Sequence, residues 1–216
     1  TLRGTPTIYN GDEIGMTNGY VPEGRRQDPT CIVSYEGMRC RDPERTPLQW
    51  NAVDSNAGFT AADTIPWLPV SKDYTNVNVE AQQKDLNSMW HTVKNLLTIR
   101  QGSEVLNHGS YTDKYVGDVN NKHGHEELFI YQRISDWTGG KKNGITFIIV
   151  NNLGVNAATF EIKQAHYKDC NVIFDSKVGA VSEAAPVSVA KSGSTFESIH
   201  FDAEQSKIIR CAVISP

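Results

Sequence analysis

The stretch from Gly11 to about Val79 constrains the fold most, because it carries no regular hydrophobic period. It is rich in Gly, Pro, Asn and Asp, and neither the two-residue period of a strand nor the 3.6-residue period of a helix is sustained in it. A connection this long is rare inside a compact domain, and it is usually a functional excursion where it occurs. We therefore expect the functional residues of the chain in this long loop.

Regular elements are expected on both sides of the loop. Thr5–Asn10 (TPTIYN) is a β-branched and aromatic run that ends at Gly11, which predicts a buried strand. From Glu80 to Arg100 apolar residues recur at steps of three and four, which predicts one amphipathic helix with a stop at Gly102. One strand and one helix cannot bury a core, so this part of the chain is expected to be an incomplete unit.

Beyond Val105 the sequence changes to short runs with strand composition separated by turn residues. The runs are Glu127–Ile134, Ile145–Val150, Ala158–Ile162, Asn171–Phe174, Val187–Ala190 and Ile208–Ile214. Six or more short strands at this spacing predict an antiparallel β-sandwich that forms a separate module.

Size and charge exclude several kinds of partner. With 216 residues, 38% of them hydrophobic, the chain can form one large or two small domains. Its net charge is −4 and Lys and Arg are not clustered, so no nucleic-acid partner is expected. The longest apolar runs are far shorter than the roughly 20 residues that cross a bilayer, so no membrane span is expected either.

Four cysteines lie in two local groups, and neither has the spacing of a zinc site. The simplest pairing is Cys31–Cys40 and Cys170–Cys211, while reduced cysteines and the other pairings remain open. If the cysteines are bridged, a secreted or extracellular location is expected, and anchoring to a membrane through other segments of the protein remains open. The sequence begins with Thr1 and shows no leader-like segment, so we expect processing or fragmentation to have set this N-terminus.

Three ordered blocks of the sequence resemble the maltase/oligo-1,6-glucosidase branch of the α-amylase superfamily (glycoside hydrolase family 13), particularly its animal, insect-like members. The blocks occur in the family's order and with family-like spacing, and together they cover most of residues 4–101. They are Gly4–Met16 (GTPTIYNGDEIGM), Arg41–Trp50 (RDPERTPLQW), and Gly58–Val70 (GFTAADTIPWLPV) followed by Asn76–Gln82 (NVNVEAQ).

The resemblance implies an α/β plus all-β fold from the C-terminal part of such an enzyme. Residues 1–103 would be the last β/α unit of a (β/α)8 TIM barrel, with strand 8, a long loop and helix 8. Residues 104–216 would be the antiparallel β-sandwich that follows the barrel. The long loop would then lie on the barrel face where active sites are assembled.

The resemblance also implies a retaining α-glucosidase that acts on maltose, sucrose or short oligosaccharides. In the family the nucleophilic Asp, the acid Glu and a third Asp in an N-H-D motif all precede the block that begins this sequence. No catalytic residue is therefore expected in this chain, which should be inactive without the N-terminal remainder of the enzyme. No cofactor or metal is expected within it, although a calcium ion is compatible with the remainder.

Arg41 is the one residue to which the resemblance assigns substrate binding. In family members the first Arg of this block reaches the terminal glucose, where a guanidinium can donate to the 4-hydroxyl group. The alternative is a salt bridge that only pins the loop. Because Cys40 directly precedes Arg41, a Cys31–Cys40 bridge would fix the approach of the arginine.

The other polar and aromatic residues of the blocks are expected to be structural. Neighbouring side chains on an extended segment diverge, so Asp12 and Glu13 cannot form a facing catalytic pair and should bind backbone amides or arginines. The remaining residues should hold or pack the loop, namely Arg45, Gln49, Trp50 and Trp67, although an exposed tryptophan could instead stack against a sugar face.

Two other functions remain open at this point. Non-catalytic members of the superfamily, such as transporter-associated ectodomains, erode their sugar-binding residues, and the intact block at Arg41 argues against this alternative. A stand-alone carbohydrate-binding sandwich would need exposed coplanar aromatic rings. The sequence shows no clear platform among its candidates, Tyr111, Tyr115, Tyr131, Trp137 and Tyr167.

Overall fold

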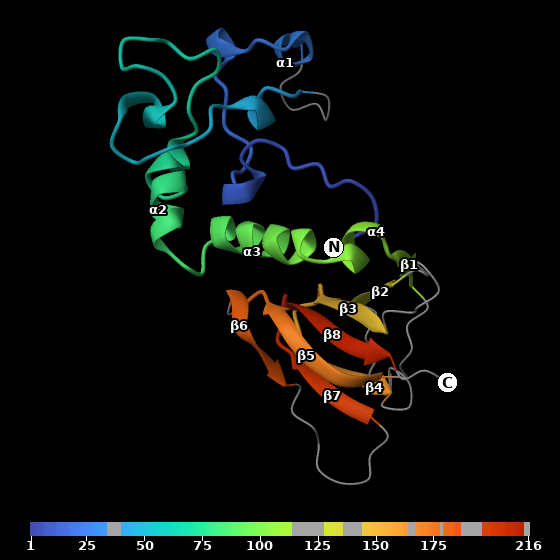
Figure 1. The fold of residues 1–216 in the computed structure, drawn as a ribbon. Coiled ribbons are helices and arrows are strands. Elements are labelled where there is room, and N and C mark those ends of the chain that lie inside the picture. The colour runs from blue at the N-terminus through green and yellow to red at the C-terminus, as the bar shows by residue number, and fades with distance from the viewer. Residues whose placement is uncertain are drawn as a thin grey trace. The chain divides into compact units, whose positions relative to one another are not determined.

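The computed structural model describes residues 1–33, 40–113, 128–135, 144–163, 167–177, 179–186 and 196–213 (Figure 1). The chain divides into two compact units. Residues 7–93 form the first, here called the loop unit. Residues 1–6, together with the chain from Lys94 onward, form the second, called the β unit. The division between the two units falls inside the helix α3 (Met89–Gln101). The domain boundary that the sequence predicts between residues 103 and 104 stays a prediction.

The structure has no strand at Thr5–Asn10, so the prediction of a buried strand there is wrong for this structure. Residues 2–10 are exposed and lack regular structure. A strand needs neighbouring strands to bond its backbone N–H and C=O groups. None of the described strands pairs with this segment, so the β-branched and aromatic sequence has nothing to pair with.

The long loop is built from short turns around a small core. Its regular elements are the helix α1 (Pro29–Val33) and the 3₁₀ turns Asp12–Ile14, Glu23–Arg25, Pro43–Arg45, Ser55–Gly58 and Lys72–Thr75. Ile14, Leu48 and Val79 form the buried core, one from each of three separated sequence blocks. The core therefore ties together the segments around residues 14, 48 and 79.

Two helices replace the single helix expected over Glu80–Arg100. They are α2 (Val79–Lys84) and α3 (Met89–Gln101). The Asp85 carboxylate accepts a bond from the Asn87 N–H, and the Ser88 hydroxyl donates to the Gln82 carbonyl. Asp and Ser side chains compete in this way with helical hydrogen bonds, which ends α2 before α3 begins. α3 stops immediately before Gly102, as predicted.

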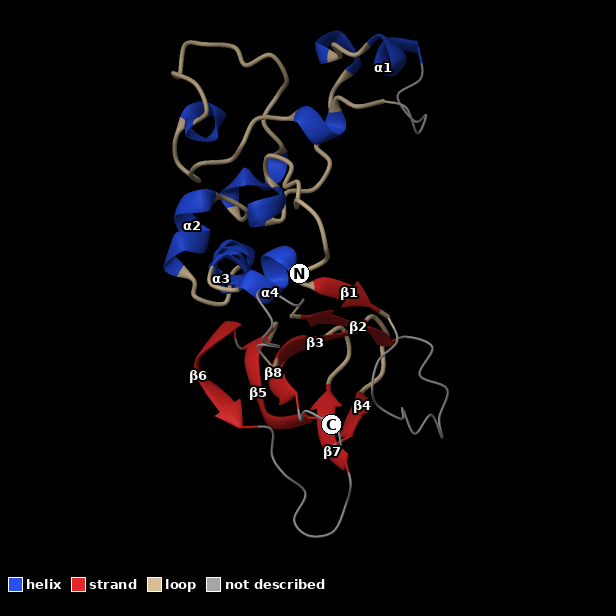
Figure 2. Cartoon of the chain, turned by 45° about the vertical axis from the view of Figure 1, so that its right-hand side comes forward, coloured by secondary structure: helices blue, strands red, loops and turns tan. Residues whose placement is uncertain are grey.

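The β unit contains a six-stranded and a two-stranded sheet, and every described pairing is antiparallel (Figure 2). The order in the large sheet is β1-β2-β3-β8-β5-β6, and β4 pairs with β7. The strands are β1 (Ser110–Thr112), β2 (Leu128–Ile134), β3 (Ile145–Asn152), β4 (Ala158–Lys163), β5 (Tyr167–Asp175), β6 (Gly179–Pro186), β7 (Phe196–Phe201) and β8 (Ser206–Val213).

The antiparallel arrangement predicted from the sequence is confirmed, and five of the expected strands appear as β2, β3, β4, β5 and β8. The expected strand Val187–Ala190 lies outside the described residues. β1, β6 and β7 were not predicted. β6 consists largely of Ala, Gly and Ser, which are weak strand formers, so its pairing with β5 rather than propensity determines it.

The large sheet buries both of its faces. One face packs against β4 and β7 through residues such as Ile148 and Phe160, while the other packs against α3 and α4 (Glu104–His108) through residues such as Phe147 and Leu106. β3 is therefore apolar on both sides, which accounts for the continuous run in its sequence. No described helix is long and apolar enough to cross a membrane.

Candidate functional site

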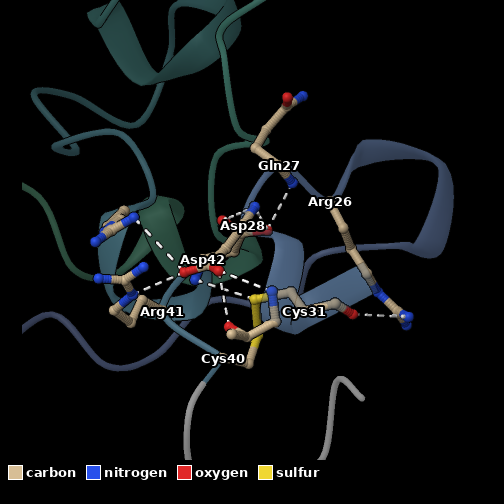
Figure 3. The surroundings of a disulfide bond; sticks show 9 residues. Arg26, Gln27, Asp28, Cys31, Cys40, Arg41 and Asp42 are labelled. Atoms are coloured by element: carbon tan, nitrogen blue, oxygen red, sulfur yellow. Dashed lines mark hydrogen bonds and ion pairs between the residues drawn. A yellow bond between two sulfur atoms is a disulfide. The ribbon is translucent and has the colours of Figure 1, made fainter. Parts of the chain in front are cut away.

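Arg41 lies on the surface of the loop unit, directly after Cys40 and before a buried Asp42. Its side chain is 56% exposed, and its Nε atom donates a 2.8 Å hydrogen bond to Oδ2 of Asp28 (Figure 3). This is the one contact that the structure describes for the Arg41 guanidinium. The hydrogen bond to Asp28, followed by the negative charge of that carboxylate, raises the pKa of Arg41 above its already high value.

Asp28 is the buried partner in this pair, with a side chain that is 1% exposed. Its Oδ1 accepts bonds from the N–H of Thr30 at 2.9 Å and from the Thr30 hydroxyl at 2.7 Å. Together with the Arg41 bond, these bonds hold the pKa of Asp28 well below its usual range, the Thr30 hydroxyl making the largest contribution. Asp28 is therefore a fixed negative charge at neutral pH.

The position of Asp28 follows from local sequence. The residue precedes α1, Pro29 occupies the first helical position, and the Asp28 side chain caps the N–H two residues on. Asp before Pro at a helix start is a favoured capping arrangement. The cap uses Oδ1, which leaves Oδ2 for Arg41.

Asp42 holds the backbone of the same region in place. Its fully buried carboxylate accepts bonds from the N–H groups of Gln27 at 2.7 Å and of Asp28 at 3.0 and 3.1 Å (Figure 3). Asp42, the residue after Arg41, thus binds the backbone of Asp28, whose side chain pairs with Arg41. The carboxylates of Asp28 and Asp42 therefore join the segment at residues 27–28 to the segment at residues 41–42.

A disulfide between Cys31 and Cys40 closes this region, and a second one joins Cys170 in β5 to Cys211 in β8. Beside the first bridge, the Asp42 N–H points at the Cys31 sulfur at 3.5 Å. Asp28, Cys31 and Asp42 lie close enough together to suggest metal ligands. The Cys31 sulfur is in the disulfide, however, and both carboxylates already bind N–H groups, so the donor set does not fit an ion.

Several residues expected to be structural have the expected contacts. Asp12 accepts a bond from the Tyr9 N–H, and Glu13 accepts one from the Gly11 N–H, each at 2.9 Å. Their expected role in binding backbone amides is confirmed. Nη1 of Arg45 lies 3.8 Å from Oδ2 of Asp28. The side-chain amide of the buried Gln49 donates a hydrogen bond to the Val77 carbonyl, so both residues contact other parts of the loop.

The two tryptophans differ from the prediction that they pack within the loop. Trp50 is 47% and Trp67 57% exposed, because the small core around Leu48 does not extend to them. The backbone of Trp50 is nevertheless firmly held, since its N–H donates to the Ala57 carbonyl at 2.9 Å. Ala57 has a positive φ of 53°, a strained conformation that neighbouring contacts must maintain.

The aromatic residues of the β unit do not form an exposed coplanar platform in the part of the chain that the structure describes. Tyr131 and Tyr167 are buried. The rings of Tyr111 and Tyr131 are tilted by 33°, and those of Phe129 and Tyr131 by 48°. The other two candidates, Tyr115 and Trp137, lie outside the described residues.

Asp28, like its partners Thr30 and Asp42, was not singled out by the sequence alone. The Asp-Pro pair does signal the start of a helix. Its pairing with Arg41 depends on the closure of an irregular loop, which no periodic pattern encodes.

Comparisons with known proteins find similarity in the part of the chain that contains the three sequence blocks around this site. The model for the α-amylase catalytic domain matches residues 1–109. An oligo-1,6-glucosidase of Halalkalibacterium halodurans is 33% identical, with 74% of this chain and 28% of that protein covered. Maltase A1 of Drosophila melanogaster is 32% identical, with 75% of this chain and 26% of that protein covered. The chain thus spans less than a third of the length of either relative.

Solved structures extend the similarity through the β unit. The trehalulose synthase of Pseudomonas mesoacidophila MX-45 matches with a TM-score of 0.68 and 26% identity over 97% of this chain and 36% of that one. The trehalose-6-phosphate hydrolase of Bacillus licheniformis has the same fold, with a TM-score of 0.69 at 24% identity over 97% of this chain and 36% of that one. The chain belongs to the α-amylase family, glycoside hydrolase family 13, and within it resembles the oligo-1,6-glucosidases and α-glucosidases.

Proposed function

We propose that the chain is part of a retaining α-glucosidase of the maltase or sucrase type. The enzyme would release terminal α-linked glucose from maltose, sucrose and short oligosaccharides. The blocks around residues 4–16 and 41–50 and the similarity to Maltase A1 support a maltase, and the oligo-1,6-glucosidases of bacteria are similar to the same degree. Carboxylates outside this chain would supply the nucleophile and the general acid, so the chain alone would be inactive.

The observation that carries this proposal is the state of Arg41. Its guanidinium is more than half exposed, is oriented by a buried carboxylate, and lies within the block where family members bind substrate. Nε makes the bond to Asp28, which leaves the terminal Nη groups as donors for a sugar hydroxyl or a second carboxylate. An arginine that served only to pin the loop would be expected to use its full fork of donors within the protein.

We also infer that the parent enzyme is secreted or extracellular. Both disulfides support this inference, because such bridges persist in oxidising compartments and are rare in the cytosol.

The proposal is tested by comparing the isolated chain with the intact enzyme on p-nitrophenyl α-glucoside. The intact enzyme should hydrolyse it and release the α-anomer of glucose first, as detected by proton NMR, because retention proceeds by two displacements. The isolated chain should give no turnover above background. Turnover by the isolated chain, or release of the β-anomer by the intact enzyme, would overturn the proposal.

A further inference from the structure

We propose that Asp28 is a positioning residue that presents the Arg41 guanidinium to the substrate. This inference rests on the proposed function, since it specifies how the substrate-binding arginine is held. Asp28 would not touch the sugar. It would act through the 2.8 Å bond between its Oδ2 atom and Nε of Arg41.

The bond from Asp28 uses only the Nε donor of Arg41 and leaves its terminal Nη groups for other acceptors. A guanidinium carries five N–H donors in a planar fork, and Nε is the donor closest to the backbone. A carboxylate that binds Nε restricts rotation of the plane and keeps the two terminal Nη groups for other acceptors. The Arg41 side chain is 56% exposed, so those groups belong to the part of the residue that a ligand can reach.

The anchor itself is rigid. Asp28 is buried, both of its oxygens bind side chains or backbone, and its own N–H is held by the Asp42 carboxylate. The disulfide between Cys31 and Cys40 closes the segment between the two partners. A long arginine side chain otherwise loses substantial rotamer freedom when it binds a ligand, and an anchor of this kind removes part of that loss in advance.

Electrostatics gives a second reason for a carboxylate at position 28. Arg45 Nη1 lies 3.8 Å from the same Oδ2 atom that binds Arg41. Two guanidinium groups that share one carboxylate repel each other when its charge is removed. The more exposed of the two, Arg41, would then turn away into solvent.

Two substitutions remove the carboxylate while they preserve the helix start. Asn and Ser cap helices about as well as Asp, so Asp28→Asn and Asp28→Ser should retain the bond from the Thr30 N–H and the fold of α1. Both lose the negative charge that faces Arg41. Asp113→Asn, at an exposed aspartate of the β unit, is the matched control.

The test measures kcat and KM of the intact enzyme for maltose and for maltose that lacks the non-reducing 4-hydroxyl group. Arg41→Ala should lower kcat/KM for maltose by roughly 10- to 100-fold, the range for one charge-assisted hydrogen bond. Asp28→Asn and Asp28→Ser should each raise KM for maltose by roughly 5- to 10-fold with a smaller change in kcat. Combined with Arg41→Ala, or assayed on the deoxy substrate, either Asp28 change should add less than about 2-fold.

The outcomes separate the two claims. If Arg41→Ala leaves kcat/KM for maltose unchanged, Arg41 does not bind the substrate, and the positioning role proposed for Asp28 is overturned as well. If Arg41→Ala has its effect but both Asp28 variants match the wild type, only the positioning role is overturned. It is also overturned if the Asp28 variants lose the same activity in the Arg41→Ala background, since that pattern indicates general damage to the fold. Asp113→Asn should match the wild type throughout.

Discussion

Arg133 and Arg41 illustrate how burial decides what a guanidinium does. Arg133 in β2 is completely buried, and it donates to the carbonyl oxygens of Thr1, Leu106 and Gly109 at 2.8 to 2.9 Å. Those carbonyls belong to the first residue of the described chain, to α4 and to the residue before β1. Arg133 therefore joins three segments of the β unit through backbone groups, whereas Arg41 keeps donors available at the surface.

Replacement of Arg133 by Met should destabilise the β unit strongly. The change leaves three carbonyl oxygens without their charged donor, which should cost roughly 3–5 kcal/mol. Urea unfolding followed by far-UV circular dichroism measures the loss. Arg210→Met, at an exposed position of β8, is the control and should change stability by less than about 0.5 kcal/mol. Equal losses in the two variants would show that the buried contacts of Arg133 carry no special weight.

The polar site could be predicted only in part from the sequence. Arg41 was found because it lies in a recognisable block, and the amide-binding roles of Asp12 and Glu13 follow from the divergence of adjacent side chains. Asp28 has a local signal for its capping role and none for its pairing with Arg41. The second role appears only when the irregular loop closes and brings the two residues together.

At the scale of elements, the disulfide between Cys170 and Cys211 crosslinks the adjacent strands β5 and β8. Their register shifts between Lys168 and Asn171, and Asp169 there has a positive φ of 52°. The regular ladder is interrupted at the point where the covalent bond joins the strands. The bridge therefore joins the two strands at one of the places where their regular register is interrupted.

The two disulfides should differ in their contribution to stability. The 41-residue separation of Cys170 and Cys211 predicts a loss of about 4 kcal/mol on their joint replacement by Ala, from the entropy of loop closure in the unfolded chain. The 9-residue separation of Cys31 and Cys40 predicts about 2.5 kcal/mol. Thermal unfolding of the two double variants tests this order. A larger loss for the Cys31/Cys40 variant would contradict the entropic explanation.

Strands and helices differed in how well the sequence predicted them. β2, β3, β4, β5 and β8 were found because their apolar and β-branched residues fill the core of the β unit. The break between α2 and α3 was missed because the apolar period continues across it, while the competing hydrogen bonds of Asp85 and Ser88 are not part of that period. The strand expected at Thr5–Asn10 has the right composition but no described neighbour to pair with.

At the scale of the whole molecule, the two units have very unequal cores. The β unit contains two buried clusters built from both faces of its large sheet, whereas the core of the loop unit centres on Ile14, Leu48 and Val79. Most of the large hydrophobic side chains exposed in the described chain belong to the loop unit. They are Ile8, Tyr9, Tyr20, Ile32, Val33, Trp50, Val53, Phe59, Ile65, Trp67, Leu86 and Met89. The loop unit thus leaves more of its large apolar side chains in solvent than the described part of the β unit does.

Hydrogen exchange on the chain should reveal this difference directly. Amides of β3 and β8 lie at the centre of the large sheet, so they should exchange only through extensive unfolding of the β unit. Amides of residues 41–50 should exchange on the order of 100-fold faster or more, because the small core around Ile14, Leu48 and Val79 opposes local opening less than the two larger clusters of the β unit do. In the intact enzyme the exchange of residues 41–50 should slow markedly while that of β3 changes little. Equal protection of the two regions in the chain alone would instead mean that the loop unit holds its structure, including the Asp28–Arg41 pair, without the rest of the barrel.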